Sequence, residues 1–463
     1  MPILAGFMVP HPPMIVPAVG RGSEKQVEKT TRAYEQAAEE IAALRPDTII
    51  ITSPHATMYA DYFHISPGRS ARGDFGQFRA GQESYRVDYD AELTSLISKL
   101  AREKGFPAGV MGERDRKLDH GTMVPLYFIR KAYPEMCKIV RIGLSGLPLT
   151  EHYRLGQMIR EAVDILGRRA VFVASGDLSH KLQSYGPYGF AAEGPQYDKR
   201  IMDVCSRAAF GELFDFEESF CEKAAECGHR SFVIMAGAFD GLSVKAAQLS
   251  HEDVTGVGYG ICTFYPGEPD EGRHFLAQYL VKASEKLSAA RAQEDPYVQL
   301  ARKTVEMYVR DRVKPEVPAG LPPEMLSTRA GAFVSIHEHG KLRGCIGTIA
   351  PVRSCVAQEI IDNAVSASTR DPRFDPITAD ELEWLEISVD VLGEAEPIAS
   401  PAELDVKRYG VIVTKGTRRG LLLPDLDGVD TVEQQIAIAK SKAGIADWDK
   451  KVQLERFEVV RHH

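Results

Sequence analysis

The sequence predicts an α/β protein in which a central sheet is flanked by helices and is followed by a smaller mixed α+β unit. Short apolar runs that stop at Pro, Gly or Ser alternate with amphipathic segments through the first half of the chain, which is typical of parallel strands joined by helices. A cluster of Pro, Gly and acidic residues at 266–272 then interrupts the periodicity. Beyond it, a hairpin-like pattern and separate helices indicate a second unit of mixed topology.

The elements of the first unit follow from the spacing of apolar residues. Residues 23–44 carry apolar side chains at helical spacing behind a Ser23-x-x-Gln26 capping box, and Pro46 precedes the next apolar run. We expect further helices at 91–104, 152–166, 196–211 and 231–240, and strands at 138–144, 170–174, 244–249 and 257–264. The first unit is therefore predicted to span residues 1–266.

The second unit is predicted to follow a linker and a charged bridging helix, which together occupy residues 267–294. It spans residues 295–463 and opens with a helix at 297–309 and a Pro-rich loop at 314–323. Strands are expected at 331–337, 342–348, 385–391, 410–414 and 420–423, and helices at 354–367 and 431–443.

The composition indicates a soluble, folded, cytoplasmic protein. The 463 residues are 44% hydrophobic, and we find neither a basic leader nor an apolar run long enough to cross a bilayer. The seven cysteines form no Cys-x-x-Cys pair, so free thiols are expected. The net charge is −9 with dispersed basic residues, which argues against nucleic acid and membranes as partners and favours a small-molecule substrate.

Three apolar runs in the first 180 residues end on a histidine, at His11, His55 and His180. Ligands bind beyond the carboxyl ends of strands in open α/β sheets, so these side chains are expected to gather. Two histidines and one carboxylate with open coordination positions are typical of non-haem Fe(II) enzymes. His11 and His55 each follow a proline, which stiffens the backbone, and we predict them as the two imidazole ligands.

The third metal ligand is predicted to come from the segment 224–231. Glu226 is the favoured carboxylate, because it lies just before a glycine at the start of a predicted helix. Cys227 and His229 are rivals within three residues, and a thiolate would also bind iron, copper or zinc. The residues alone leave this choice open.

Two histidines are candidates for proton transfer rather than for metal binding. His120 follows Asp119, and His180 ends the segment Gly176-Asp-Leu-Ser-His180. An imidazole titrates near neutral pH, and a neighbouring carboxylate such as Asp119 or Asp177 fixes its tautomer and raises its basicity. Either histidine is a candidate general base.

The segments around His11, His55, Asp119-His120-Gly121, Gly176-Asp-Leu-Ser-His180 and Glu226-Cys-Gly228 resemble the class III extradiol ring-cleavage dioxygenase superfamily, in particular its LigB- and Memo-like branch. The resemblance covers roughly residues 3–265. It implies Fe(II) held by His11, His55 and Glu226, an acid–base role for His180, and a position near the substrate for His120. Memo-like proteins often carry Cys-Gly near the third ligand, as Cys227-Gly228 does here, which puts both the ligand set and the oxygen chemistry in question.

The second unit contains Leu342-Arg-Gly-Cys-Ile-Gly347, in which a cysteine lies between two glycines. A turn at this point would expose the thiol of Cys345, and Arg343 next to it would lower the pKa of that thiol. Arg370 and Arg373 would act in the same way if the fold brings them close. The structural alternative is that Cys345 is a small core residue after a strand.

This hexapeptide, the segment Arg370-Asp-Pro-Arg-Phe374 and Gly420-Leu-Leu-Leu-Pro424 resemble the AMMECR1 domain over about residues 295–460. The resemblance implies a fold but no reaction. Memo-like and AMMECR1-like modules also occur beside a radical SAM protein in the three-part AmmeMemoRadiSam grouping, which implies such a protein as a partner.

Three functions are compatible with these residues. The leading one is a metal-dependent dioxygenase-like enzyme that acts on a small phenolic or cyclic substrate at an Fe(II) site, with Mn, Zn or Cu as alternative metals. The second uses the same site without O₂ to cleave a C–C or C–N bond of a cyclic ketone or amide. The third is a non-enzymatic scaffold that works with the radical SAM protein, and a homo-oligomer is compatible with all three.

Overall fold

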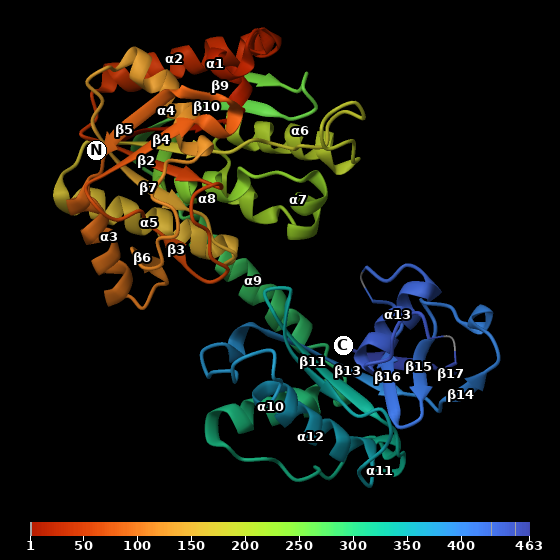
Figure 1. Cartoon of the computed structure of the whole chain (residues 1–463). Coiled ribbons are helices and arrows are strands. Elements are labelled where there is room, and N and C mark those ends of the chain that lie inside the picture. Colours follow the sequence, from red (N-terminus) through yellow and green to blue (C-terminus); the bar gives the residue numbers. More distant parts are fainter. Residues whose placement is uncertain (1, 427, 450) are drawn as a thin grey trace. The chain divides into compact units, whose positions relative to one another are not determined.

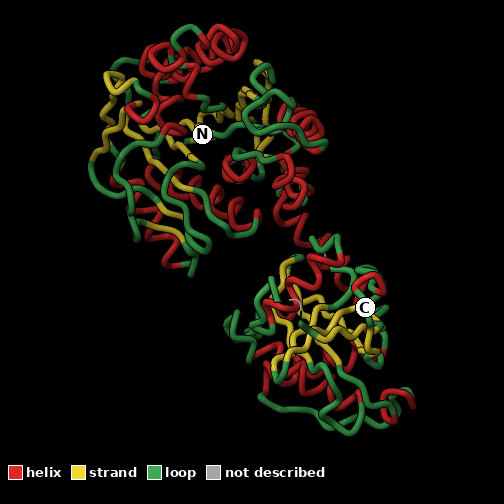
Figure 2. Tube along the Cα trace, turned by 45° about the vertical axis from the view of Figure 1, so that its right-hand side comes forward, coloured by secondary structure: helices red, strands yellow, loops and turns green. Residues whose placement is uncertain are grey.

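The computed structural model describes residues 2–426, 428–449 and 451–463, and it divides into two units, Met1–Leu280 and Val281–His463 (Figure 1). The division falls inside helix α9 (Phe275–Arg291). Figure 2 shows that each unit contains both helices and strands, and each is described separately below. No helix in these described ranges is both long enough and apolar enough to cross a membrane.

A six-stranded mixed sheet with the strand order β7-β2-β8-β1-β10-β9 forms the centre of the first unit. Strands β7, β2, β8 and β1 run parallel to one another, whereas β10 and β9 add antiparallel. The strands are β1 Ile3–Val9, β2 Thr48–Ser53, β7 Lys138–Gly143, β8 Ala170–Ser175, β9 Leu242–Glu252 and β10 Tyr259–Pro269. The predicted α/β class, with a central sheet flanked by helices, is confirmed.

Alternate side chains of the parallel strands fill two cores, one on each face of this sheet. Phe7 and Ile51 pack with residues of α2 and α4, whereas Met8 and Ile50 pack with residues of α3, α5 and α8. Because both faces are covered, the strands are apolar throughout instead of alternating with polar residues. The helices are α1 Pro17–Gly20, α2 Glu28–Leu44, α3 Ala91–Glu103, α4 His120–Ala132, α5 Leu149–Leu166, α6 Glu193–Ser206, α7 Glu218–Ala224 and α8 His229–Ala238.

The structure adds elements that the hydrophobic spacing does not indicate. These are the hairpin of β4 (Ser70–Phe75) and β5 (Ala80–Asp88), the two-residue strands β3 (Phe63–His64) and β6 (Ala108–Gly109), and helix α4. Helix α4 contains Pro125, a residue that normally breaks a helix interior. It begins at His120, one residue after its N-cap Asp119.

The first four residues of the Pro/Gly cluster at 266–272, Pro266–Pro269, belong to β10. This strand pairs with β9 through Pro266, which faces Val244, and Pro269, which faces Leu242. The pairing of β10 with β1 ends at Phe264. The prolines therefore lie where β10 has a hydrogen-bonded neighbour on one side only, so a missing backbone N–H can be tolerated. The observed division, between Leu280 and Val281, falls within the segment 267–294 that was expected to contain the linker and bridging helix.

The second unit contains two four-stranded sheets and is a mixed α+β fold, as predicted. The strand orders are β12-β11-β13-β18 and β14-β17-β15-β16. The strands are β11 Ala332–Glu338, β12 Lys341–Gly347, β13 Leu385–Leu392, β14 Glu396–Ile398, β15 Gly410–Lys415, β16 Arg418–Leu422, β17 Gln453–Phe457 and β18 Val459–His462. The helices are α10 Pro296–Asp311, α11 Pro323–Ser327, α12 Val356–Thr369 and α13 Val432–Lys442.

Candidate metal centre

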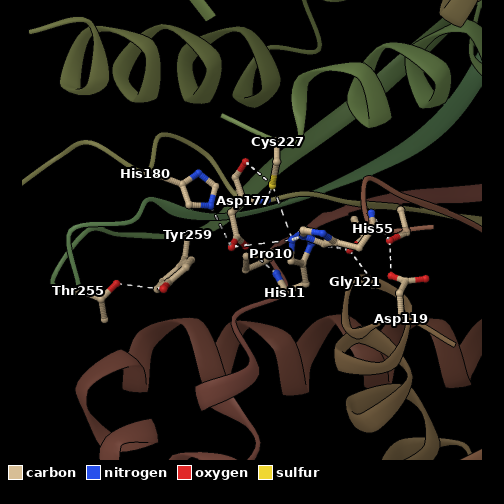
Figure 3. Close-up of polar contacts among 12 residues, drawn as sticks. Pro10, His11, His55, Asp119, Gly121, Asp177, His180, Cys227, Thr255 and Tyr259 are labelled. Carbon is tan, nitrogen blue, oxygen red and sulfur yellow. Dashed lines mark hydrogen bonds and ion pairs between the residues drawn. The ribbon is translucent and has the colours of Figure 1, made fainter. Parts of the chain in front are cut away.

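Three of the predicted site residues lie at the carboxyl ends of neighbouring parallel strands. His11 follows β1, His55 follows β2 and Asp177 follows β8, and these strands are adjacent in the order β2-β8-β1. Parallel strands end at the same edge of a sheet, and the three side chains converge there (Figure 3).

His11 is held in one tautomer by a hydrogen-bond chain. Its side chain is buried, and Nδ1 lies 3.0 Å from Oγ of Ser175, which donates its own hydrogen to the carbonyl of Gly121 at 2.6 Å. Because the hydroxyl hydrogen of Ser175 is used in this way, its oxygen accepts the hydrogen on His11 Nδ1. The lone pair of His11 therefore lies on Nε2, which faces the other candidate ligands.

Two groups of potential ligand atoms meet at His11. Its Nε2 lies 3.0 Å from Nε2 of His55 and 3.6 Å from Sγ of Cys227 (Figure 3). The rings of His55 and His120 have centroids 4.0 Å apart. Ligand atoms within 4.8 Å of one another come from His11, His55 and His120 in one group and from His11, Asp177 and Cys227 in the other.

The two contacts of His11 have the separation of neighbouring ligands on a metal ion, although His55 and Cys227 fall in different groups of ligand atoms. Nitrogen and sulfur ligands lie about 2.0–2.3 Å from a first-row metal, so two of them around one ion are roughly 3–3.6 Å apart. The distances from His11 Nε2 to His55 and to Cys227 fall in this range. Imidazoles together with a thiol or a carboxylate form a donor set that suits iron, zinc or copper.

Burial keeps the imidazoles of this cluster neutral. Burial, followed by the charge of His55, lowers the pKa of His11 well below its usual value and lowers the pKa of His120 to about 4. Burial also lowers the pKa of His55, against the opposing charge of Asp119. Neutral imidazoles present the lone pairs that a metal needs.

The thiol of Cys227 has the opposite requirement. Burial, followed by the charge of Asp177, raises the pKa of Cys227 well above its usual value. The thiol is therefore protonated in the absence of a cation. A metal that binds this sulfur must displace a proton.

The carboxylate of Asp119 is occupied by an ion pair and by hydrogen bonds, so it positions the cluster and does not act as a base. Its carboxylate lies 3.3 Å from Nε of the buried Arg141 and accepts hydrogen bonds from Oγ of Ser53 at 2.5 Å and from the backbone N–H of Thr122 at 3.0 Å. Burial opposes ionisation, but Arg141 and these hydrogen bonds lower the pKa of Asp119. The carboxylate caps α4 and thereby fixes His120, the first residue of that helix.

Glu226, the favoured third ligand from the sequence, lies apart from both groups of ligand atoms in the described part of the chain. Its carboxylate accepts the backbone N–H of His229 at 2.6 Å and lies 3.5 Å from the hydroxyl of Tyr197. The side chain thus satisfies the first turn of α8, where a carboxylate is favoured. His229 is also engaged elsewhere, since its Nε2 lies 3.0 Å from the carbonyl of Leu213. Cys227 is the residue of this segment that reaches His11.

Asp177 and His180 lie together on the other side of His11. One oxygen of Asp177 accepts the backbone N–H of His11 at 2.7 Å, and the other lies 4.0 Å from Nε2 of His180. Nδ1 of His180 donates to the carbonyl of Ala225, which leaves the lone pair on Nε2. His180 therefore presents a proton-accepting nitrogen to the site (Figure 3).

Three supporting residues were missed by the sequence interpretation. Ser175 orients His11, while Ser53 and Arg141 hold Asp119 in place. Ser53 and Ser175 are the last residues of β2 and β8, so polar strand ends were the signal that could have indicated them. Arg141 lies inside β7 among apolar residues, and its buried charge there was the corresponding signal.

The second-unit candidate Cys345 lies in the edge strand β12, not in an exposed turn. Its backbone N–H donates to the carboxylate of Asp371 at 2.9 Å, and its carbonyl accepts from Arg373 at 3.2 Å. Arg373 in turn binds both oxygens of Asp371, at 2.9 and 2.7 Å. The thiol accepts a hydrogen bond from Ser335 on the neighbouring strand at 3.3 Å.

Arg343, the other candidate in this unit, points to a different partner. Its Nε lies 2.6 Å from the carboxylate of Glu381, and its Nη1 donates to the carbonyl of Asp375 at 2.7 Å. Arg343 therefore forms an ion pair with Glu381.

Comparison with known proteins gives a match for each unit. Residues 5–262 match the family described as the catalytic LigB subunit of aromatic ring-opening dioxygenase, and residues 298–462 match the AMMECR1 family. A protein of Clostridium acetobutylicum is 42% identical over 465 residues, which cover 98% of this chain and 98% of that protein. A protein of Thermotoga maritima is 52% identical over 170 residues, covering 36% of this chain and 98% of that protein. The beta subunit of a 2-aminophenol 1,6-dioxygenase from a Pseudomonas species is 29% identical over 290 residues, covering 56% of this chain and 92% of that protein.

Proposed function

Because the chain belongs to the family of the catalytic LigB subunit of aromatic ring-opening dioxygenases, with an AMMECR1 domain fused behind it, we propose that its first unit is a metal-dependent enzyme that acts on a small phenolic substrate. The proposed metal is Fe(II). Its proposed ligands are His11 and His55, with Cys227 as the third and Glu226 as the alternative.

One observation carries this proposal. Nε2 of His11 faces both a second imidazole and a thiol, since it lies 3.0 Å from Nε2 of His55 and 3.6 Å from Sγ of Cys227. His11 is buried, and a buried nitrogen at such distances is normally paired with a complementary donor or acceptor, or binds a cation. The tautomer of His11 that Ser175 enforces leaves a lone pair on the nitrogen that faces the cluster.

The metal would supply chelation of adjacent substrate oxygens and, as Fe(II), the capacity to bind O₂. His180 supports a role as general base, because its Nε2 carries a lone pair and Asp177 stabilises the imidazolium that forms when it accepts a substrate proton. Asp177 also positions the cluster, since it holds the backbone of His11. His120 stays neutral above about pH 4 and is suited to hydrogen bonding with the substrate.

This arrangement favours a substrate whose two neighbouring polar groups reach the metal ligands and His180 together. A substrate with two adjacent heteroatoms on a ring would present one proton to His180 while both heteroatoms face the metal ligands. The relative from Pseudomonas is named for 2-aminophenol, a compound of this kind. We therefore propose catechols and 2-aminophenols as the first substrates to test.

A second candidate function is favoured by Cys227. Two imidazoles and a thiolate also suit Zn(II), which does no redox chemistry but activates water and polarises carbonyl groups. In this version the site hydrolyses a C–C or C–N bond of a cyclic ketone or amide, and His180 again moves the proton. A radical SAM partner for the AMMECR1 domain stays a separate proposal.

Metal content tests the proposed ligand set. Wild-type protein and single variants are loaded with Fe(II) without oxygen, desalted and measured by inductively coupled plasma mass spectrometry. Wild type and Glu226→Gln are expected to retain iron, whereas His11→Ala and Cys227→Ala lose it. Cys345→Ala in the second unit is the matched control for Cys227→Ala and should retain iron. Iron-free wild type, or equal iron in all variants, would overturn the proposal.

Turnover then separates the two functions. Oxygen uptake is followed with catechol and 2-aminophenol on the iron-loaded wild type and on His180→Gln, which should keep its iron but lose most of its turnover. Hydrolysis of a cyclic diketone by the zinc-loaded protein under nitrogen, without oxygen uptake on either phenol, would establish the second function in place of the first.

A further inference from the structure

The residues that follow His180 form a closed loop, residues 181–191, which we call the Tyr188 loop. An antiparallel bridge between Leu182 and Phe190 closes it, and the backbone N–H of Ala191 donates to the carbonyl of Lys181 at 3.1 Å. The loop therefore begins at the proposed general base and returns to it.

The Tyr188 loop displays three aromatic side chains to solvent. Tyr185, Tyr188 and Phe190 are 72%, 59% and 58% exposed, respectively. Exposed aromatic rings gathered in one loop are unusual in a folded protein and mark binding surfaces. Proximity to a candidate active site makes a small-molecule ligand the relevant partner.

Among these three rings, that of Tyr188 contacts a site histidine, His180, in the part of the chain that the structure describes. Its ring and that of His180 have centroids 5.1 Å apart and stand at 90° to each other. The ring of His180 is itself fixed by its hydrogen bond to the carbonyl of Ala225. Tyr188 therefore contacts a histidine ring whose orientation is fixed.

Tyr259 is a buried residue on the same side of the site as His180 (Figure 3). The pKa of Tyr259 is raised by burial and then by Asp177, while a hydrogen bond from Thr255 opposes the rise and the phenol of Tyr188 adds to it. Figure 3 places Tyr259 next to His180 and Asp177. Through its ring contact with His180, Tyr188 therefore lies next to the proposed base.

The position of Tyr188 is set by the loop backbone. Gly189 next to it has φ of +75°, a conformation that other residues rarely adopt. A side chain at Gly186 would meet the backbone of Gly256 at 3.0 Å, so the loop also rests directly on the neighbouring chain. These constraints hold an exposed ring beside the site without burying it.

We propose that Tyr188 is a specificity-determining residue, whose ring packs against the planar ring of an aromatic substrate and selects it over a saturated ring of the same size. The inference rests on the proposed metal-dependent function, because the substrate is placed by chelation at the histidine cluster. Aromatic rings prefer offset-stacked or edge-to-face contacts with one another, and a puckered saturated ring cannot reproduce these contacts. Tyr188 is thus the side chain that recognises the aromatic ring of the phenolic substrate proposed above.

Two chelators with the same metal-binding group test this proposal. Benzohydroxamate carries an aromatic ring, and cyclohexanecarbohydroxamate carries a saturated ring in its place. Both are titrated by calorimetry into the full-length protein loaded with Zn(II), which avoids oxygen chemistry. The readout is the ratio of the two dissociation constants, in which the contribution of chelation cancels.

Tyr188→Leu is expected to reduce the preference for benzohydroxamate by roughly 3- to 10-fold, the range of one aromatic contact. Tyr188→Phe should keep the wild-type ratio, since the ring and not the hydroxyl makes the contact. Tyr185→Leu changes the more exposed tyrosine of the same loop in the same way and is the matched control, with the wild-type ratio expected.

The outcomes separate the inference from the proposed function. An unchanged ratio in Tyr188→Leu, with full zinc content and measurable binding of both chelators, overturns the role of Tyr188 alone. An equal loss of preference in Tyr185→Leu also overturns it, since the effect would then belong to the loop as a whole. Absence of bound metal in the wild type overturns the proposed function and this inference together.

Discussion

In the first unit, the histidine cluster brings together groups of like chemical character, whereas in the second unit the residues of the signature motifs pair with complementary groups. Nε2 of His11 faces a second imidazole and a thiol, all neutral. Around Cys345, by contrast, Asp371 takes the backbone N–H, Arg373 takes the carbonyl, and the two side chains bind each other.

The partners of its residues show whether a sequence motif serves the fold or is a candidate binding site. Asp371 and Arg373 occupy the outward-facing hydrogen-bonding groups of an edge strand, which protects that edge from pairing with other chains. The motif is then explained by the fold. At the cluster of His11, by contrast, like groups face one another, which is the observation on which the proposed metal site rests.

The largest effect is expected from adding one methyl group beneath the metal centre. A Cβ at Gly176 would lie 2.0 Å from Cα of Gly228, so Gly176→Ala pushes the end of β8 away from the segment that carries Cys227. We expect loss of Fe(II) uptake and a fall of about 3 kcal/mol in the free energy of unfolding of the first unit. Metal analysis and urea unfolding followed by circular dichroism measure the two effects.

Gly272→Ala is the control for this change, because its Cβ would meet only one side-chain oxygen of Asp270, at 3.2 Å, in an exposed turn. Normal iron content in Gly176→Ala would show that the close packing at Gly228 is not needed for the metal centre.

A smaller loss is expected when the orienting partner of His11 is removed. Ser175→Ala deletes the oxygen that accepts the hydrogen of Nδ1, so the imidazole loses its fixed tautomer. Metal affinity should fall by about 10- to 100-fold, the usual effect of losing such a partner. Competition with a fluorescent zinc chelator measures it. Ser335→Ala, which removes the hydroxyl next to Cys345, should leave the affinity unchanged.

In the second unit, Asp371→Ala is expected to act on stability alone. It leaves the N–H of Cys345 and the guanidinium of Arg373 without their acceptor, which should lower the free energy of unfolding by about 1–3 kcal/mol. The two tryptophans of the chain, Trp384 and Trp448, both belong to this unit, so denaturation followed by tryptophan fluorescence reports on it. A change in iron content would contradict the separation of roles.

The pH dependence of stability should also differ between the units. Burial lowers the pKa of His120 and His229 to about 4 and that of His152 to about 3, all in the first unit. Between the unfolded value of about 6.5 and these values the unfolded chain binds more protons, so stability falls with falling pH, by about 1.4 kcal/mol per pH unit for each histidine. This contribution is fully present above about pH 6.5.

In the second unit, hydrogen bonding to Arg373 lowers the pKa of Asp371, so the contribution of this carboxylate persists down to about pH 4 and is lost below it. Burial also lowers the pKa of His337 in this unit. With this one histidine, the free energy of unfolding of the second unit should fall less steeply below about pH 6.5 than that of the first unit. Circular dichroism and tryptophan fluorescence recorded from pH 7 to pH 4 should therefore separate, with the first unit lost earlier. Coincident transitions would contradict this expectation.

The smallest effect is expected from Cys345→Ala. The thiol accepts one hydrogen bond from Ser335 and is only partly buried, so the free energy of unfolding should change by less than about 1 kcal/mol. If this variant loses a cellular function but keeps its stability, the motif around Cys345 has a chemical role and not a structural role alone.

Much of the fold could be predicted because it depends on local spacing. The strands that carry His11 and His55 are continuous apolar runs, and the resemblances drawn from short motifs are confirmed by the two family matches. The hairpin β4–β5 could not be predicted, because two of the three buried positions of β4 are the small Ala71 and Gly73, and β5 alternates only weakly. The run through Pro266 was interpreted as a linker, since nothing local reveals that β9 provides a partner for it.

The candidate site was predictable in its residue types but not in its contacts. Strand ends indicated His11 and His55, yet the sequence could not decide between Glu226 and Cys227, which are adjacent. Their difference arises from the turn into α8, where Glu226 points back to the backbone of His229 and Cys227 points to His11. Such a choice depends on backbone direction at one residue, which composition and spacing do not encode.

The place of β1 in the sheet has a consequence for how the protein is made. This strand carries His11 and lies between β8 and β10, whose residues begin at Ala170 and Tyr259. During synthesis, β1 leaves the ribosome before β8 and β10, so it cannot pair until both of these strands have been made. Contacts so distant in sequence form slowly. The metal centre is therefore expected to assemble late, and a nascent chain shorter than about the first unit should bind no iron.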